Sequence, residues 1–221
     1  MKSLTQYDAL IFDMDGTLVD NMHYHHLSWI ALFKEFHLPL DMETFEKDYH
    51  RGTLLEVMAR LFPQIQTREE LLKIGERKEE LYRNLYHPHL SRIDGLLEFL
   101  QKAKNLHIPM GLSTMGNQTN ISFTLGGLGL DSFFTAKTGG DQVIHGKPHP
   151  EIFIQTAHKL GVDAKKCLAF EDTQSGITAA LSAGMQVVGI TTQFSIAKLL
   201  DMGCVFAIGT YTEILHLFDQ N

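Results

Sequence analysis

Two pairs of acidic residues stand in this sequence where short apolar runs end. Asp13 and Asp15 follow the first run, and Glu171 and Asp172 follow a later one. Neighbouring carboxylates repel each other unless a cation or a shared proton lies between them. Both pairs are therefore candidates for metal binding or for acid and base chemistry.

Three further polar residues follow apolar runs, or lie in a loop after one. Ser113 and Thr114 precede a predicted helix, so their hydroxyl and backbone N–H groups can hold phosphoryl oxygens. Lys147 adds a positive charge for the same anion. An aspartate can attack phosphorus and carry the group as an acyl phosphate. Acids at 171 and 172 can complete an oxygen shell for Mg²⁺. These residue types predict phosphoryl transfer.

Short apolar runs alternate with helical patterns over most of the chain. Strands are predicted at residues 9–12, 108–112, 133–136, 167–170, 187–190 and 205–208, and helices at residues 96–103, 119–128, 150–160, 177–183 and 211–218. Strands separated by helices of this length imply a parallel sheet covered on both faces. The predicted fold class is α/β with a Rossmann-like parallel sheet, which binds ligands beyond the carboxyl ends of its strands.

Residues 20–90 interrupt this alternation with helical patterns alone. Helices are predicted near residues 27–34, 53–62 and 67–86, the last opened by the capping-box spacing that begins at Thr67. We therefore predict two domains. Residues 1–19 and 91–221 form the α/β core, and residues 20–90 form an inserted α-helical domain.

Composition limits the classes of partner. At 221 residues, with 44% hydrophobic residues, the chain can form one core and a smaller insertion. A net charge of -7 without a Lys/Arg stripe argues against nucleic-acid binding. No apolar stretch forms before Asp8, which argues against a signal peptide, and the absence of an 18-residue apolar stretch argues against a membrane span. Cys167 and Cys204 lack CxxC spacing, which predicts buried free thiols. We expect a cytoplasmic monomer with no membrane partner.

The order of the four motifs resembles the haloacid dehalogenase superfamily. The motifs are residues 13–17 (DMDGT), 111–114 (GLST), 146–148 (GKP) with the proline at 150, and 171–176 (EDTQSG). The resemblance implies that Asp13 is the nucleophile and that Asp172 binds the metal. It implies that Asp15 is the general acid and base and a metal ligand through its backbone carbonyl. Ser113 and Lys147 would bind the phosphoryl group, and the helical insertion would be a cap that closes over the site.

Within the superfamily the chain is most similar to the β-phosphoglucomutase-like branch. That likeness implies substrate contacts from cap and loop residues, namely His25, Arg51, Gly52, Lys78 and Asn117. It also implies that Glu171 is a second carboxylate ligand of Mg²⁺. Known mutases carry a polar Ser-Lys pair where this chain has Met115 and Gly116, and a cap arginine where it has Leu55. Both normally hold the phosphate that is not transferred, so the departures favour turnover by water.

The predicted function is that of an Mg²⁺-dependent phosphohydrolase acting on a small phosphorylated metabolite, such as a sugar phosphate, through an aspartyl-phosphate. The alternative is a β-phosphoglucomutase-type isomerase. A dehalogenase or a non-catalytic sugar-phosphate-binding regulator stays open as a third class. Taken singly, Ser113 and Glu171 are also explained as helix caps and Lys147 as a surface lysine.

Overall fold

The computed structural model describes residues 3–49 and 52–219, and the chain divides into two compact units. One unit comprises residues 1–20 and 91–221, and the other comprises residues 21–90. Among the described residues, no helix combines the length and apolar character needed to cross a membrane.

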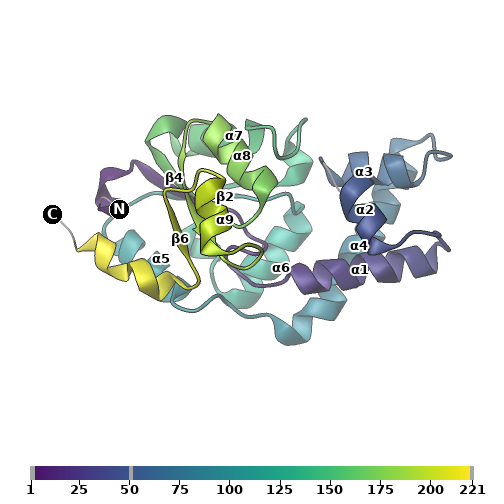
Figure 1. Ribbon diagram of the computed structural model, residues 1–221, viewed down its shortest axis with the longest axis horizontal. Helices are drawn as coiled ribbons and strands as arrows, with labels where there is room; N and C mark the ends of the chain where they lie inside the picture. The colour runs from purple at the N-terminus through teal and green to yellow at the C-terminus, as the bar shows by residue number, and fades with distance from the viewer. Residues whose placement is uncertain (1–2, 50–51, 220–221) are drawn as a thin grey trace. The chain divides into compact units, whose positions relative to one another are not determined.

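A parallel sheet forms the centre of the larger unit (Figure 1). Within the described residues it has six strands in the order β3-β2-β1-β4-β5-β6. Their bounds are β1 (Ala9–Phe12), β2 (Met110–Ser113), β3 (Ala136–Thr138), β4 (Cys167–Glu171), β5 (Gln186–Ile190) and β6 (Phe206–Ile208). All of β1 is buried, which explains its unbroken apolar run. The strand order reverses at β1, so the carboxyl ends of β1, β2 and β4 meet where such sheets bind ligands. The predicted α/β class is confirmed.

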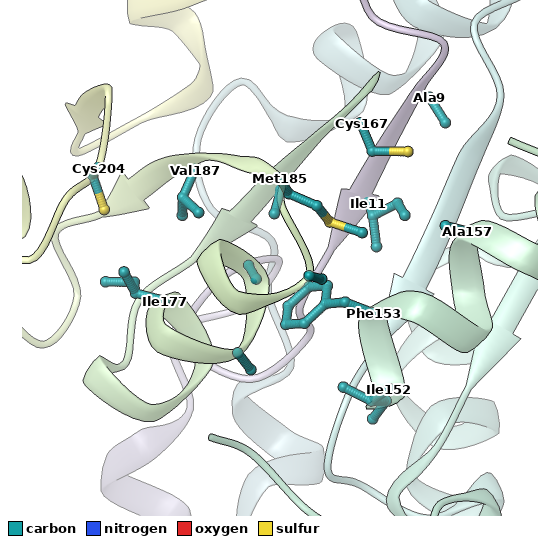
Figure 2. Packing of buried hydrophobic residues seen from close by; sticks show 14 of the residues in the cluster. Ala9, Ile11, Ile152, Phe153, Ala157, Cys167, Ile177, Met185, Val187 and Cys204 are labelled. Atoms are coloured by element: carbon teal, nitrogen blue, oxygen red, sulfur yellow. The ribbon is translucent and has the colours of Figure 1, made fainter. Parts of the chain in front are cut away.

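The two faces of the sheet carry different apolar side chains. On one face the Phe12 and Phe170 rings stack, with centroids 4.5 Å apart, and Phe99 of α5 (Leu96–Asn105) packs edge-on against both. On the other face, Ile11 and Val187 belong to a buried cluster that includes side chains of α7 (Glu151–Leu160) and α8 (Gln174–Ser182) (Figure 2). Leu199 of α9 (Ile196–Asp201) belongs to the same cluster. Helix α6 (Gln118–Leu128) follows β2.

The smaller unit contains α1 (Met22–Glu35), α2 (Met42–Asp48), α3 (Leu54–Leu61) and α4 (Arg68–Tyr86). Its core includes Trp29 and Phe45, whose ring centroids lie 4.5 Å apart. The Thr53 and Glu56 side chains form a reciprocal capping box at the start of α3. At the start of α4 the Thr67 hydroxyl accepts a hydrogen bond from the Glu70 N–H. These caps mark helix starts that periodicity alone locates within a few residues.

The sequence predictions were wrong in several short segments. The strand expected at residues 133–136 begins only at Ala136, because Asp131–Phe133 forms a 3₁₀ turn that buries Phe133. Tyr211–Phe218 is also 3₁₀. Helices α2 and α9 were not predicted, since each spans two turns or fewer and shows too little periodicity. Both cysteines are buried free thiols, as predicted.

Candidate active site

Three polar residues share one register position at the carboxyl edge of the sheet. Phe12 pairs with Leu112 of β2 and with Phe170 of β4. One residue further along, Asp13, Ser113 and Glu171 stand side by side and project toward the same face. Asp13 is 6% exposed, and the other two are fully buried. Thr138 of β3 pairs with Ser113 and extends the row. The parallel register thus gathers residues that are far apart in the sequence.

Lys147 joins this row through its ammonium group. Its Nζ lies 2.5 Å from Asp13 Oδ1 and 2.6 Å from Glu171 Oε1, and it donates to the Ser113 carbonyl oxygen at 3.1 Å. The lysine side chain is almost completely buried. A buried ammonium with three oxygen partners has all its N–H groups satisfied. Lys147 is therefore part of the site rather than a surface lysine.

A tight turn follows β1, and its backbone at Gly16 lies directly against the Asp172 carboxylate. Gly16 has a φ of +79°, and its N–H donates to the Val19 carbonyl oxygen at 2.8 Å. A Cβ at Gly16 would overlap the Asp172 carboxylate, so only glycine permits this approach. Thr192 donates to the Gly16 carbonyl oxygen at 2.6 Å and lies 3.3 Å from Asp172 Oδ2. Asp15, in the same turn, is half-buried.

The charges of this cluster do not balance. Burial, reinforced by the charges of Glu171 and Asp15, raises the pKa of Asp13 well above its usual range, although Lys147 opposes the shift. Burial and the Glu171 and Asp13 charges likewise raise the pKa of Asp172. For Lys147, burial lowers the pKa, but the Asp13 and Glu171 carboxylates outweigh it and raise it. Three buried carboxylates thus face one buried ammonium, an arrangement that favours a further cation.

The residues fit Mg²⁺ better than a softer metal. The groups of Asp13 and Asp172 that could ligate a metal are carboxylate oxygens, which Mg²⁺ prefers. Within the described ranges, no group of three or more His, Cys, Asp or Glu side chains is arranged to hold a metal ion. A site resting on two carboxylates is compatible with Mg²⁺, because this ion usually takes one or two carboxylates and completes its shell with water and phosphate oxygens.

The Glu171 carboxylate is occupied by other groups of the chain. Its Oε2 accepts hydrogen bonds from the backbone N–H groups of Asp172 and Thr173, at 2.8 and 2.9 Å, and Oε1 faces Lys147. These contacts favour Glu171 as the partner that holds Lys147 and the start of α8, rather than as a direct ligand of Mg²⁺. Its predicted metal role stays a prediction.

The predicted phosphate-binding hydroxyls make hydrogen bonds within the core unit. Ser113 Oγ donates to Thr156 Oγ1 at 2.7 Å, and Thr114 Oγ1 accepts from the Gly116 N–H at 3.0 Å. Asn117 caps α6, with its Oδ1 accepting from the Asn120 N–H at 2.9 Å. Ser113 and Thr114 lie at the predicted edge of the sheet, and Asn117 lies at the start of the next helix.

Two of the predicted substrate residues meet inside the helical unit. Lys78 Nζ lies 2.9 Å from His25 Nδ1 and 3.0 Å from Glu79 Oε1, and the lysine is 3% exposed. The His25 ring stacks on Tyr82 at 3.8 Å. The chain at Gly52 has a φ of +85°. Arg51 lies outside the described residues.

Sequence reasoning missed three threonines around the acidic cluster. Thr192 contacts Asp172 and the Gly16 carbonyl, while Thr138 and Thr156 lie beside Ser113. The position of Thr192 just after β5 was an available signal, because the other site residues also follow strands. Thr156 lies inside α7, where no sequence pattern sets it apart from core residues.

Comparison with known proteins indicates one family for this chain. A family model described as haloacid dehalogenase-like hydrolase matches residues 10–190. The chain is 29% identical over 219 residues to a phosphorylated carbohydrates phosphatase of Thermotoga maritima, covering 96% of this chain and 99% of that protein. It is 31% identical over 189 residues to a β-phosphoglucomutase of Bacillus subtilis, covering 82% of each. A solved structure from Entamoeba histolytica, a HAD hydrolase of family IA, variant 3, superposes with a TM-score of 0.82 at 30% identity, covering 96% of this chain and 97% of that one.

Proposed function

Because the chain belongs to the haloacid dehalogenase-like hydrolases, we propose that it is a phosphatase that releases phosphate from a small phosphorylated carbohydrate. The observation that carries the proposal is the Lys147 ammonium at 2.5 Å from Asp13 Oδ1, at the carboxyl edge of the sheet. A cation at this position can hold a phosphoryl oxygen beside the carboxylate that attacks phosphorus. The named activity of the Thermotoga maritima relative supports the substrate class.

In the proposed reaction the carboxylates act in two steps. An Asp13 oxygen attacks phosphorus, the bond from phosphorus to the sugar oxygen breaks, and Asp15 gives its proton to that oxygen. In the second step Asp15 takes a proton from water, the water oxygen attacks phosphorus, and the bond to Asp13 breaks to release phosphate. Lys147 and Ser113 would hold the phosphoryl oxygens during both steps.

Mg²⁺ would be held by Asp13 and Asp172, with the Asp15 backbone carbonyl as a further ligand. When bound, it would offset the negative charge of nucleophile and phosphate. The charge imbalance of the cluster supports this assignment, since three buried carboxylates face one ammonium. Within the helical unit, the pair of half-buried His25 and buried Lys78 is the proposed contribution to substrate selection.

A mutase is the second candidate, because a named β-phosphoglucomutase is among the relatives. One feature of α6 favours the phosphatase. A second phosphate would gain from free N–H groups and a cation at the start of this helix. Here Met115 and Gly116 supply no cation, and the Asp141 carboxylate lies 3.5 Å from the Gln118 N–H. That negative charge would repel a bisphosphate.

Product analysis separates the two activities. Phosphorylated sugars, including β-glucose 1-phosphate and fructose 1-phosphate, are incubated with the protein and Mg²⁺, and free phosphate is measured against isomerised sugar phosphate. We expect free phosphate from wild type and none from Asp13→Asn. Formation of glucose 6-phosphate without phosphate release would establish the mutase instead. Chloride release from a haloacid without metal would establish a dehalogenase.

A further inference from the structure

A buried chain of hydroxyl groups runs from Ser113, the proposed phosphate ligand, to two threonines that have no role in the reaction described above. It consists of Ser113 in β2, Thr138 in β3 and Thr156 in α7, all with 0% exposure. Thr156 Oγ1 lies 2.7 Å from Ser113 Oγ and 2.8 Å from Thr138 Oγ1. At the far end, the Lys159 ammonium donates to Thr138 Oγ1 at 3.0 Å.

The proton of Ser113 is committed within this chain. A serine hydroxyl has one proton to donate. In the structure it is donated to Thr156 Oγ1, and the Ile152 carbonyl oxygen at 3.5 Å is a longer alternative. Thr156 itself has nearby acceptors for its own proton, including the Ile152 carbonyl oxygen at 2.9 Å and Thr138 Oγ1. Its lone pairs therefore remain available to Ser113.

A bound phosphoryl group would compete for the same proton. Ser113 shares its register position with Asp13, and its carbonyl oxygen accepts from the Lys147 ammonium, so it lies next to the proposed phosphoryl site. A phosphoryl oxygen is charged and is the stronger acceptor. To donate to a phosphoryl oxygen, the Ser113 hydroxyl must break its hydrogen bond to Thr156. The free energy of the broken bond lowers the affinity for phosphate.

We infer that Thr156 is a positioning residue that holds the Ser113 hydroxyl away from the phosphoryl site and thereby weakens phosphate binding. The inference rests on the proposed function, since it takes Ser113 as a phosphate ligand. A role of this kind suits an enzyme that must release inorganic phosphate after each turnover. Exchange of Thr156 for an apolar residue of the same shape should then tighten binding, whereas damage to the fold would weaken it.

Thr156→Val tests this prediction. The variant keeps the side-chain shape and removes the acceptor. We expect the dissociation constant of inorganic phosphate to fall about 2- to 12-fold, which corresponds to the net free energy of one hydrogen bond. The constant is measured by calorimetry on the full chain with Mg²⁺, and the KM for a turned-over sugar phosphate should fall in parallel. Thr156→Ser keeps the hydroxyl and should restore the wild-type constant.

A matched control and a double variant isolate the effect. Thr124 in α6 is a buried threonine whose hydroxyl has no hydrogen-bond partner among the described residues, so Thr124→Val should leave the constant unchanged. In a Ser113→Ala background, Thr156→Val should have no effect on phosphate affinity, because the proton for which the two acceptors compete is gone.

The outcomes separate this inference from the proposed function. If wild type binds phosphate and releases it from a phosphate ester, but Thr156→Val binds phosphate equally or more weakly, Thr156 is only structural and the inference is overturned. An undiminished effect of Thr156→Val in the Ser113→Ala background overturns it as well. If wild type neither binds phosphate nor turns over any phosphate ester, the proposed function itself fails, and the inference fails with it.

Discussion

Lys147 and Asp13 are 134 positions apart in the sequence, yet the ammonium of one lies 2.5 Å from a carboxylate oxygen of the other. The same ammonium reaches Glu171 at 2.6 Å. Both contacts are buried, so each charge depends on the others for solvation that water no longer supplies. This triad links the loop before α7 to the ends of β1 and β4, and it connects the stability of the core with the chemistry of the site.

Removal of the Lys147 charge should lower the free energy of unfolding. Lys147→Met leaves Asp13 and Glu171 buried without their cation, which costs about 3–5 kcal/mol for a broken buried pair. The free energy of unfolding is measured by urea titration. Lys166→Met is the matched control, because Lys166 pairs with Asp8 at 3.6 Å on the surface, where an ion pair contributes about 1 kcal/mol or less. Equal losses in the two variants would contradict the buried triad.

Exchange of Asp172 for asparagine should stabilise the metal-free protein. Burial and the neighbouring acids raise the pKa of Asp172, so its charged form is disfavoured in the folded state. The stability of wild type relative to Asp172→Asn is therefore greatest at low pH. It falls as the pH rises above about 4, which is the pKa of this carboxyl group in the unfolded chain. With EDTA at pH 7 the variant should have the higher Tm, by about 2–4 °C for each kcal/mol relieved.

Magnesium provides the second arm of the Asp172 experiment. Mg²⁺ should raise the Tm of wild type and have little effect on Asp172→Asn, since ligand binding to the folded state alone is stabilising. Asp131→Asn serves as a control, because Asp131 is an exposed acid paired with Lys137. A lower Tm for Asp172→Asn than for wild type in EDTA would refute the predicted charge imbalance.

The turn at Gly16 should tolerate no side chain. Gly16→Ala combines a left-handed backbone, which costs about 1–2 kcal/mol, with overlap between the new Cβ and the Asp172 carboxylate. Gly129→Ala isolates the backbone cost, because Gly129 has a φ of +68° and nothing within 4 Å of an added Cβ. We expect Gly129→Ala to remain active with the smaller loss of stability, and Gly16→Ala to lose more stability and phosphate release. Full activity of Gly16→Ala would show that phosphate release does not depend on the observed position of the Asp172 carboxylate.

The two buried thiols should make the protein sensitive to alkali. Burial raises the pKa of Cys167 to about 12 and that of Cys204 to about 11, from an ordinary value of 9.0. Above pH 9 the unfolded chain loses these protons while the folded chain retains them, so stability falls as the pH rises. The urea midpoint should drop less between pH 8 and pH 10 in a Cys167→Ala, Cys204→Ala variant than in wild type. An equal drop would exclude the thiols as the cause.

By itself, the sequence determined the fold class and identified most of the side chains of the candidate site. Apolar runs alternating with helical patterns predicted the parallel sheet, because burial on both faces leaves strands such as β1 without polar positions. The rule that ligands gather beyond strand ends singled out Asp13, Glu171 and Asp172 before any contact was known. The family resemblance drawn from the motifs was confirmed by the match over residues 10–190.

Only the tertiary structure decided which of these groups touch. Strand register, set by hydrogen bonds between segments distant in sequence, placed Ser113 and Glu171 on either side of Asp13. Side-chain packing then paired the Glu171 carboxylate with the Lys147 ammonium. It also directed the Ser113 hydroxyl proton to Thr156 Oγ1. A sequence pattern reports how often an apolar residue recurs along one element. It carries no information about which partner a buried hydroxyl or carboxylate finds on the next element, and that choice separates a metal ligand from a positioning group.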